Sequence, residues 1–244
     1  MKKILIFSCA FLTLAVAHSS PCEEAAQAYL LRLDDKEARR SLELYEQLAS
    51  TNSVDTCPDA PLKAAKAAWW VADHSPSKKE KMALLQKGID FSKKAIRLNP
   101  GSAAAHFWLA GNYGSFGEVK GVLKSLALVK PIRKELNEVL KIDPDYDDGA
   151  AYRVLGVVDY KVPGFAGGNK KRAEEQLKKA LEMGSQNPFN LYYAAEYYET
   201  VGNDVKATVY LDRLDALDPT EEEIPDWTMM QEKGKLLRPR LKKK

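Results

Sequence analysis

The chain has 244 residues, with 37 basic and 34 acidic side chains, a formal net charge of +3, and a composition that is 45% hydrophobic and 29% charged. Those proportions exclude a collagen-like repeat, a disordered polyelectrolyte, a disulfide-dense miniprotein and a polytopic membrane protein. A chain of this length can bury a large core, so it needs neither a metal ion nor a dense cystine network in order to fold.

The first residues predict an export signal. Met1-Lys2-Lys3 provides a positive start, residues 4–16 are almost wholly apolar, and Ala15-Val16-Ala17 supplies the small residues that a signal peptidase recognises. The apolar stretch is shorter than the roughly 20 residues that span a bilayer. We therefore expect residues 1–17 to be a signal peptide and the mature chain to begin near His18 in the periplasm.

Two cysteines remain after this cleavage, and in an exported chain they predict a disulfide between Cys22 and Cys57. Two helices are predicted between them, at 23–33 and 36–50, so the bond would close a helical hairpin and contribute roughly 3 kcal/mol. Unpaired thiols are one alternative. A lipoprotein anchored at Cys22 is another, less favoured because Pro21 stands where lipid attachment requires a small residue.

The body of the chain is predicted to be a helical repeat. Apolar residues recur at spacings of three and four from residue 22 onward, without the alternation of a strand, which indicates an all-α protein. Asn-Pro or Asp-Pro ends amphipathic segments at 99–100, 143–144 and 218–219, and small residues precede these prolines at fixed offsets. This spacing resembles the tetratricopeptide repeat, in which small residues allow two antiparallel helices to approach closely.

We accordingly expect one tetratricopeptide-like solenoid over residues 18–237, with a basic tail at 238–244. A terminal helix should cover the exposed end, because solenoids need a cap. The predicted helix pairs lie at about 22–51, 59–98, 102–143, 147–183 and 188–218, and the predicted capping helix lies at 221–237.

The third pair departs from the repeat in its glycines. A continuous helix would place all of them on one face at about 1 kcal/mol each relative to alanine, which suggests that a neighbouring helix or a ligand needs the space. A helix break at the second or third glycine is the equal alternative. The second helix of this pair is predicted to run to Ile142 with a kink at Pro131. The glycines are Gly111, Gly114, Gly117 and Gly121.

An insertion over residues 160–170 separates the helices of the fourth pair. Its tip, Val162-Pro163 with Phe165, is unusually apolar for an exposed loop. A loop folded back over the groove would explain that composition. The alternative is a long turn that ends at Asn169, the cap of the next helix, although such a turn leaves Phe165 unexplained.

Several of these segments together resemble the T-component family, the tetratricopeptide proteins associated with periplasmic tripartite (TRAP) transporters. The resemblance covers roughly residues 60–218. It implies a homotrimer that docks a periplasmic solute-binding protein and encloses a largely apolar ligand cavity. A general exported scaffold for envelope protein assembly, without a small ligand, is the alternative. The segments are His106-Phe107-Trp108-Leu109-Ala110, Asn112-Tyr113-Gly114, residues 139–144, residues 149–156 and Val162-Pro163-Gly164-Phe165-Ala166-Gly167-Gly168.

No motif for catalysis, metal binding or a cofactor is present, so we expect a binding protein and not an enzyme. The first helix of each pair should line the concave face, where aromatic rings and one guanidinium would suit a small apolar or organic-acid ligand. Packing of Phe107 and Tyr192 in the core, and pairing of Arg153 with Glu196 or Asp159, are the alternatives. The candidate ligand-binding residues are Phe107, Gly111, Asn112, Arg153, Tyr160, Phe165, Tyr192 and Glu196.

The C-terminus concentrates positive charge, since residues 233–244 carry seven Lys or Arg and no acid. Attraction to anionic lipid or to an acidic partner is one interpretation. A solvated tail is the favoured one. We expect membrane contact only through this tail or through lipidation, and no nucleic-acid binding, because no basic stripe follows the solenoid.

Overall fold

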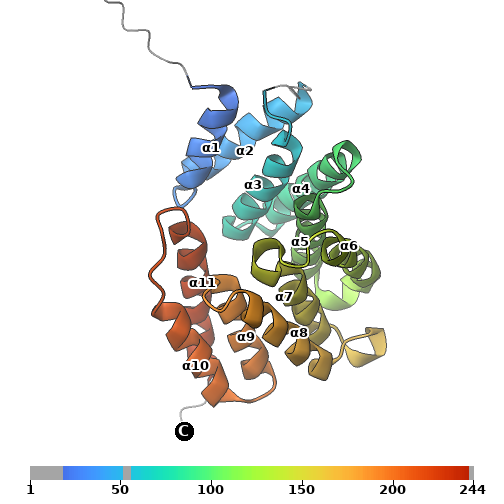
Figure 1. The fold of residues 1–244 in the computed structure, drawn as a ribbon, viewed down its shortest axis with the longest axis vertical. Helices are drawn as coiled ribbons and strands as arrows, with labels where there is room; N and C mark the ends of the chain where they lie inside the picture. The colour runs from blue at the N-terminus through green and yellow to red at the C-terminus, as the bar shows by residue number, and fades with distance from the viewer. Residues whose placement is uncertain (1–18, 52–55, 242–244) are drawn as a thin grey trace, which may run out of the picture.

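The structure is a computed structural model that describes residues 19–51 and 56–241, and all regular structure within those residues is helical. The predicted signal peptide, residues 1–17, lies outside them. Figure 1 shows the helices following one another around an arc, which confirms the all-α solenoid of five pairs and a final helix. The pairs are α1 (Pro21–Leu30) with α2 (Asp35–Ser50), α3 (Ala60–His74) with α4 (Lys78–Leu98), α5 (Ala103–Lys120) with α6 (Val129–Ile142), α7 (Tyr146–Lys161) with α8 (Lys170–Met183), and α9 (Pro188–Thr200) with α10 (Asp204–Asp215), followed by α11 (Ile224–Leu237).

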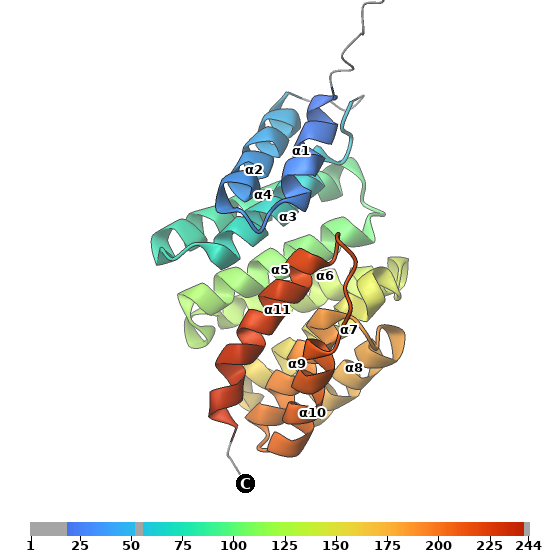
Figure 2. The same cartoon turned by 90° about the vertical axis from the view of Figure 1, so that its left-hand side faces the viewer.

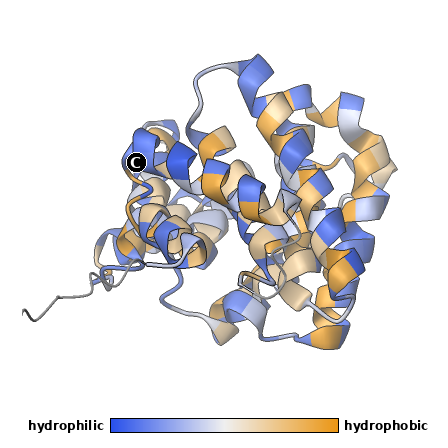
Figure 3. Ribbon diagram, turned by 90° about the horizontal axis from the view of Figure 1, so that it is seen from above, coloured by the Kyte–Doolittle hydropathy of each residue, from blue (hydrophilic) through white to orange (hydrophobic). Residues whose placement is uncertain are grey.

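Small residues set the spacing of the helices, as the repeat pattern predicts. Four alanines of α3, at positions 64, 65, 67 and 68, are all buried, and a Cβ built on Gly156 would lie only 2.8 Å from Leu177 Cγ on α8. Apolar residues therefore meet between the helices, and hydrophilic residues alternate with them along each helix (Figure 3). No helix among the described residues has the length and apolarity that crossing a bilayer requires.

The last helix does more than cover the end of the solenoid. Trp227 Nε1 donates to Leu214 O on α10 at 3.0 Å, which anchors α11 on the fifth pair. The same helix reaches the first two pairs, because Asp226 pairs with Arg32 at 3.0 Å and Lys233 pairs with Asp73 at 2.8 Å. Figure 2 shows α11 lying across the open side of the arc. The predicted cap is therefore also a strap between the two ends.

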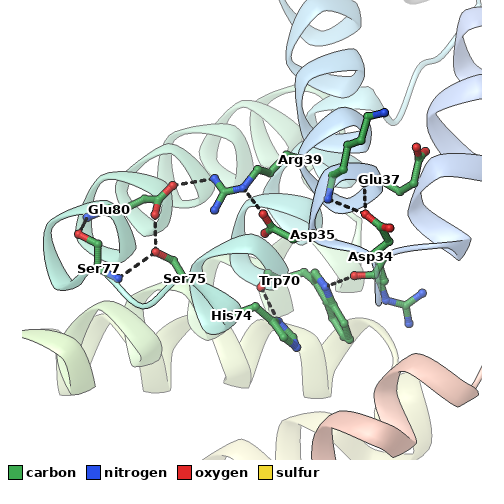
Figure 4. A network of polar contacts seen from close by, with 11 residues as sticks. Asp34, Asp35, Glu37, Arg39, Trp70, His74, Ser75, Ser77 and Glu80 are labelled. Carbon is green, nitrogen blue, oxygen red and sulfur yellow. Dashed lines mark hydrogen bonds and ion pairs between the residues drawn. The ribbon is translucent and has the colours of Figure 1, made fainter.

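A polar network joins the first two helix pairs (Figure 4). The Arg39 guanidinium bridges Asp35, at 2.8 Å, and Glu80 on α4, at 2.6 Å. Beneath it Trp70 Nε1 donates to Arg32 O in the α1–α2 turn at 2.9 Å. Because these surface ion pairs contribute little energy individually, the network mainly sets the orientation of the two pairs.

The predicted disulfide is present, since Cys22 and Cys57 are bonded with their Cα atoms 5.7 Å apart. It joins the first turn of α1 to the segment that precedes α3. The closed loop contains the hairpin of α1 and α2, as expected from the spacing.

For the third pair the structure decides between two alternatives and contradicts one expectation. Helix α5 continues through Gly114 and Gly117, which excludes the alternative of a break there, and it ends at Lys120, before Gly121, whose φ of +103° suits glycine. The long kinked second helix is absent, because a 3₁₀ segment, Val122–Leu128, precedes α6. Pro131 lies in the first turn of α6, where its missing N–H breaks no helical bond.

The basic C-terminus is not a solvated tail over its described part. Lys233 belongs to α11, and a 3₁₀ turn, Arg238–Arg240, follows that helix. Arg238 pairs with Asp212 and Asp215 of α10, at 2.9 and 2.6 Å, and Arg240 pairs with Glu199 at 2.8 Å. Residues 242–244 lie outside the described residues. The acids on the outer end of the solenoid thus hold the segment that was expected to be free.

Candidate functional site: a cavity on the concave face

A cavity of about 140 Å³ lies on the concave face of the arc. All of its lining residues come from the first helix of a pair or from α11, as the projection of the repeat predicts. Aromatic side chains dominate the wall, and two of them, Trp69 and Trp108, meet edge to face with their centroids 5.5 Å apart. The lining aromatic residues are Tyr29, Trp69, Phe107, Trp108, Tyr146, Phe189 and Tyr193.

The glycines of α5 create part of this space. Gly111 and Gly114 line the cavity, and a Cβ built on Gly114 would meet no atom within 4 Å. Gly117 has a different role, because its Cβ would lie 3.3 Å from Ser125 Cβ. The glycine face predicted from the spacing therefore serves two purposes, an open wall at two positions and close packing at the third.

Arg153 lies in the wall of the cavity, but its donors are already used. The side chain is 3% exposed, and it donates to Asn190 Oδ1 and Asp147 Oδ2, each at 2.8 Å. Asp147 reaches it from a turn in which Asp147, Asp148 and Gly149 all have positive φ, at 48°, 56° and 76°. Neither acid that was expected as its partner pairs with Arg153. A ligand carboxylate would therefore have to displace Asp147.

Three predicted residues come together beside the cavity without lining it. The Tyr160 hydroxyl donates to Glu196 Oε2, and the Tyr192 hydroxyl donates to Oε1 at 3.2 Å. Lys161 lies between Glu196 at 3.1 Å and Glu118 at 2.7 Å. Burial alone would raise the pKa of Glu196, but Lys161 and the hydroxyl donors outweigh it and hold that pKa below its ordinary value of 4.5. This cluster ties α7 to α9 and α5.

The other two predicted residues lie away from the cavity. Asn112 is fully buried, donates to Trp108 O at 2.8 Å and packs against Gly88 of α4. Phe165 is 83% exposed, and the cavity has no contribution from its loop. Gly167 O in that loop accepts hydrogen bonds from Arg172 at 2.8 Å and Arg133 at 3.2 Å, which hold the loop on the outer helices. The insertion does not fold over the groove.

Among the described residues, the ammonium of Lys66 in the cavity wall forms no ion pair. Lys66 Nζ lies over the rings of Tyr29 at 5.2 Å and Trp108 at 5.8 Å. Burial lowers the pKa of Lys66 below its ordinary 10.5, although Asp226 offsets part of that effect. Every acid in the wall is already paired, as Glu118 with Lys161, Asp147 with Arg153, and Asp226 with Arg32.

Sequence reasoning overlooked Lys66 and Trp69 because candidate residues on the concave face were chosen only from the first helices of pairs three to five. The two residues are three apart on the first helix of the second pair, so the same rule would have selected them. Tyr29 and Asp226 were also overlooked. The path of α11 back across the arc brings Asp226 to the cavity, and no local pattern indicates that path.

The described residues contain one cluster with the composition of a metal site, formed by Cys22, Cys57 and Asp59 within 4.8 Å. The two sulfur atoms are bonded to each other in the disulfide. A single carboxylate is then left, which is too few ligands to hold an ion.

Comparison with known proteins relates the chain to one family. The family model described as Regulator of microtubule dynamics protein 1-3 matches residues 23–173. Regulator of microtubule dynamics protein 1 of Bos taurus is 27% identical over 129 residues, which are 52% of this chain and 39% of that protein. The protein of the same name from Pongo abelii is 26% identical over 51% of this chain and 39% of its own length. The chain thus matches about two fifths of the length of these relatives.

A solved structure supports the fold. A thermophilic TPR protein of Thermus thermophilus superposes with a TM-score of 0.60, covering 89% of this chain and 98% of that one. Its sequence is 18% identical. The likeness therefore shows a tetratricopeptide-like fold and carries no function with it.

Proposed function

Because this chain belongs to the Regulator of microtubule dynamics protein 1-3 family, and its fold is a tetratricopeptide-like scaffold, we propose that it binds a partner protein through its concave face. The observation that carries the proposal is the convergence of aromatic side chains from five helices on one cavity. Buried aromatic residues are enriched at protein interfaces and contribute much of their binding energy.

The strap α11 determines how much of a partner can enter. Solenoids of this kind bind partners along an extended concave surface. Here Asp226 of α11 already lies at the edge of the cavity, and the ion pairs of α11 hold it there. The space that remains accepts an anchoring side chain, and the rest of the partner would rest on the rim.

The names of the curated relatives concern microtubule dynamics. Those proteins match this chain over about two fifths of their length or less. Our proposal is therefore that the shared helical scaffold binds a partner protein. We do not propose that this chain regulates microtubules.

Site-specific crosslinking in the host cell tests the proposal. A photo-crosslinking amino acid would replace either Val157, which lines the cavity, or Glu175, which is exposed on the outer helix α8. We expect a discrete protein adduct from position 157, none from position 175, and loss of the adduct when Trp69→Ala removes part of the wall. Adducts that form equally from both positions, or that survive the Trp69 change, would contradict the proposal.

Docking of a solute-binding protein of a TRAP-type transporter is the second candidate. The export-like N-terminus and the Cys22–Cys57 disulfide favour a periplasmic location, because disulfides persist in oxidising compartments. The matching family and relatives lend this candidate no support. Co-purification with a solute-binding protein, a trimer mass by native mass spectrometry, and a mature N-terminus near His18 are its expected signs. A monomer that retains its first 17 residues would argue against it.

A further inference from the structure

One basic side chain of the cavity wall, Lys66, has no ion-pair partner of its own among the described residues. Its contacts at the ammonium are the faces of Tyr29 and Trp108. No hydrogen bond or ion pair joins this ammonium to another residue within 19–51 or 56–241. Each acid that lines the wall is held by another basic side chain, so the Lys66 ammonium is available to pair with an incoming anion.

The surroundings make that charge suitable for recognition. An ammonium beside aromatic rings and partly shielded from water attracts an anion more strongly than one on the open surface. Burial raises the pKa of Tyr29, of Tyr146 and of Tyr193, so these hydroxyls stay neutral and do not neutralise Lys66. An incoming anion is thus the natural counterion.

We propose that the cavity binds a compact carboxylate with one aromatic or branched apolar body, and that the carboxylate pairs with the Lys66 ammonium. The inference rests on the proposed role of the cavity as the recognition site. Trp69 and Phe107 would enclose the apolar body. A cavity of about 150 Å³ can hold benzene, so the volume of about 140 Å³ here suits a single ring.

In this proposal Lys66, and not Arg153, binds the carboxylate. The Arg153 guanidinium is saturated by Asp147 and Asn190, each at 2.8 Å, and displacing them would leave buried polar groups unpaired. Lys66 binds an anion without breaking any existing hydrogen bond. Such a carboxylate has two sources, a free aromatic acid or the C-terminal aromatic residue of a partner protein.

Titration calorimetry on the full chain tests the inference, with phenylacetate as the free acid and acetyl-Gly-Gly-Phe as the C-terminal peptide. Phenylacetamide is the neutral control. We expect Lys66→Met to weaken binding of the acid about 10- to 100-fold, because it removes a hydrogen bond to a charged group. Lys66→Arg should retain binding. Lys93→Met, at an exposed lysine 5.9 Å from the Tyr113 ring and away from the cavity, should leave affinity unchanged.

The pH dependence provides a second readout. Affinity for phenylacetate should fall as the pH rises through the Lys66 pKa, which lies below 10.5, because the ammonium then loses its charge. The weak binding of phenylacetamide should not change over that range. The other titratable and charged groups that face Lys66 are neutral tyrosines or members of ion pairs, namely Tyr29, Arg32, Glu118, Tyr146, Asp147, Arg153, Tyr193 and Asp226.

The two arms distinguish the sources. Binding of the free acid but not of the peptide identifies a small-molecule site, and tighter binding of the peptide identifies a partner C-terminus. The inference is overturned if neither ligand binds, if phenylacetamide binds as well as phenylacetate, or if Lys66→Met binds as well as the parent chain. Should carboxylate binding fail while the position-157 crosslink persists, the partner-binding proposal survives this failure. Loss of the crosslink alone overturns the partner-binding proposal and not the ligand site.

Discussion

Replacing Gly114 by alanine should make the protein more stable and at the same time weaken binding in the cavity. The new Cβ would meet no atom within 4 Å, so the methyl group fits without displacing a neighbour. Alanine is favoured over glycine in a helix interior by about 1 kcal/mol. For a domain of this size that gain raises the melting temperature by about 2–4 °C.

The matched control is Gly117→Ala in the same helix. Its Cβ would lie 3.3 Å from Ser125 Cβ, so crowding should cancel part or all of the propensity gain. Both variants are compared with the parent by urea and thermal unfolding at one pH. Affinity for phenylacetate, measured on the same samples, should fall for Gly114→Ala because the methyl group occupies the cavity. A Gly114→Ala protein that is less stable than the parent would refute the claim that residue 114 faces open space.

Three further predictions concern the framework of the site. Glu196→Gln should cost about 3 kcal/mol at pH 7, because it breaks a largely buried ion pair with Lys161. The pKa of Glu196 lies below 4.5, so the stability that its charge contributes is present above pH 4.5 and disappears as the pH falls through the folded-state pKa. In urea unfolding, Glu196→Gln should therefore cost less free energy near pH 3 than at pH 7. An equal cost at both pH values would contradict the assigned ion pair. Joint replacement of Cys22 and Cys57 by serine should cost about 3–4 kcal/mol on the loop-entropy relation, and a reductant should destabilise the parent chain equally. Gly149→Ala should cost about 3 kcal/mol, because φ is +76° and the new Cβ would lie 2.7 Å from Met183 Sδ. The control is Gly202→Ala, at φ +78°, where no atom lies within 4 Å of the new Cβ; it should cost only about 1 kcal/mol.

The helical framework could be predicted because its signals are local. The threefold and fourfold spacing of apolar residues, the Asn-Pro and Asp-Pro endings and the capping residue Asn169 all act within a few residues of one helix. Asn169 Oδ1 accepts from the Arg172 amide at 2.9 Å, as expected for that cap. The pairing of Cys22 with Cys57 was predicted because these are the two cysteines that remain after the expected cleavage.

The glycines of α5 show where local reasoning stops. Their spacing places them on one face, but propensity alone could not decide between a continuous helix and a break. Packing decided it, because Ser125 fits against Gly117 while Gly111 and Gly114 border a cavity. The same limit applies to Asn112, whose position on α5 suggested the groove and whose side chain instead fills the contact with Gly88.

By itself the sequence determined the number of helix pairs, the face of each pair that lines the groove, and the covalent link between Cys22 and Cys57. Only the tertiary structure decided which charges meet. Asp147 reaches Arg153 through a left-handed turn, Arg238 and Arg240 find acids on α10 and α9, and α11 crosses the arc to bring Asp226 to the cavity. These partners are far apart along the chain, and their encounter depends on the curvature that accumulates over five packed pairs. Lys66 is left without a counterion for the same reason, since the acids nearest to it in space are already held by other helices.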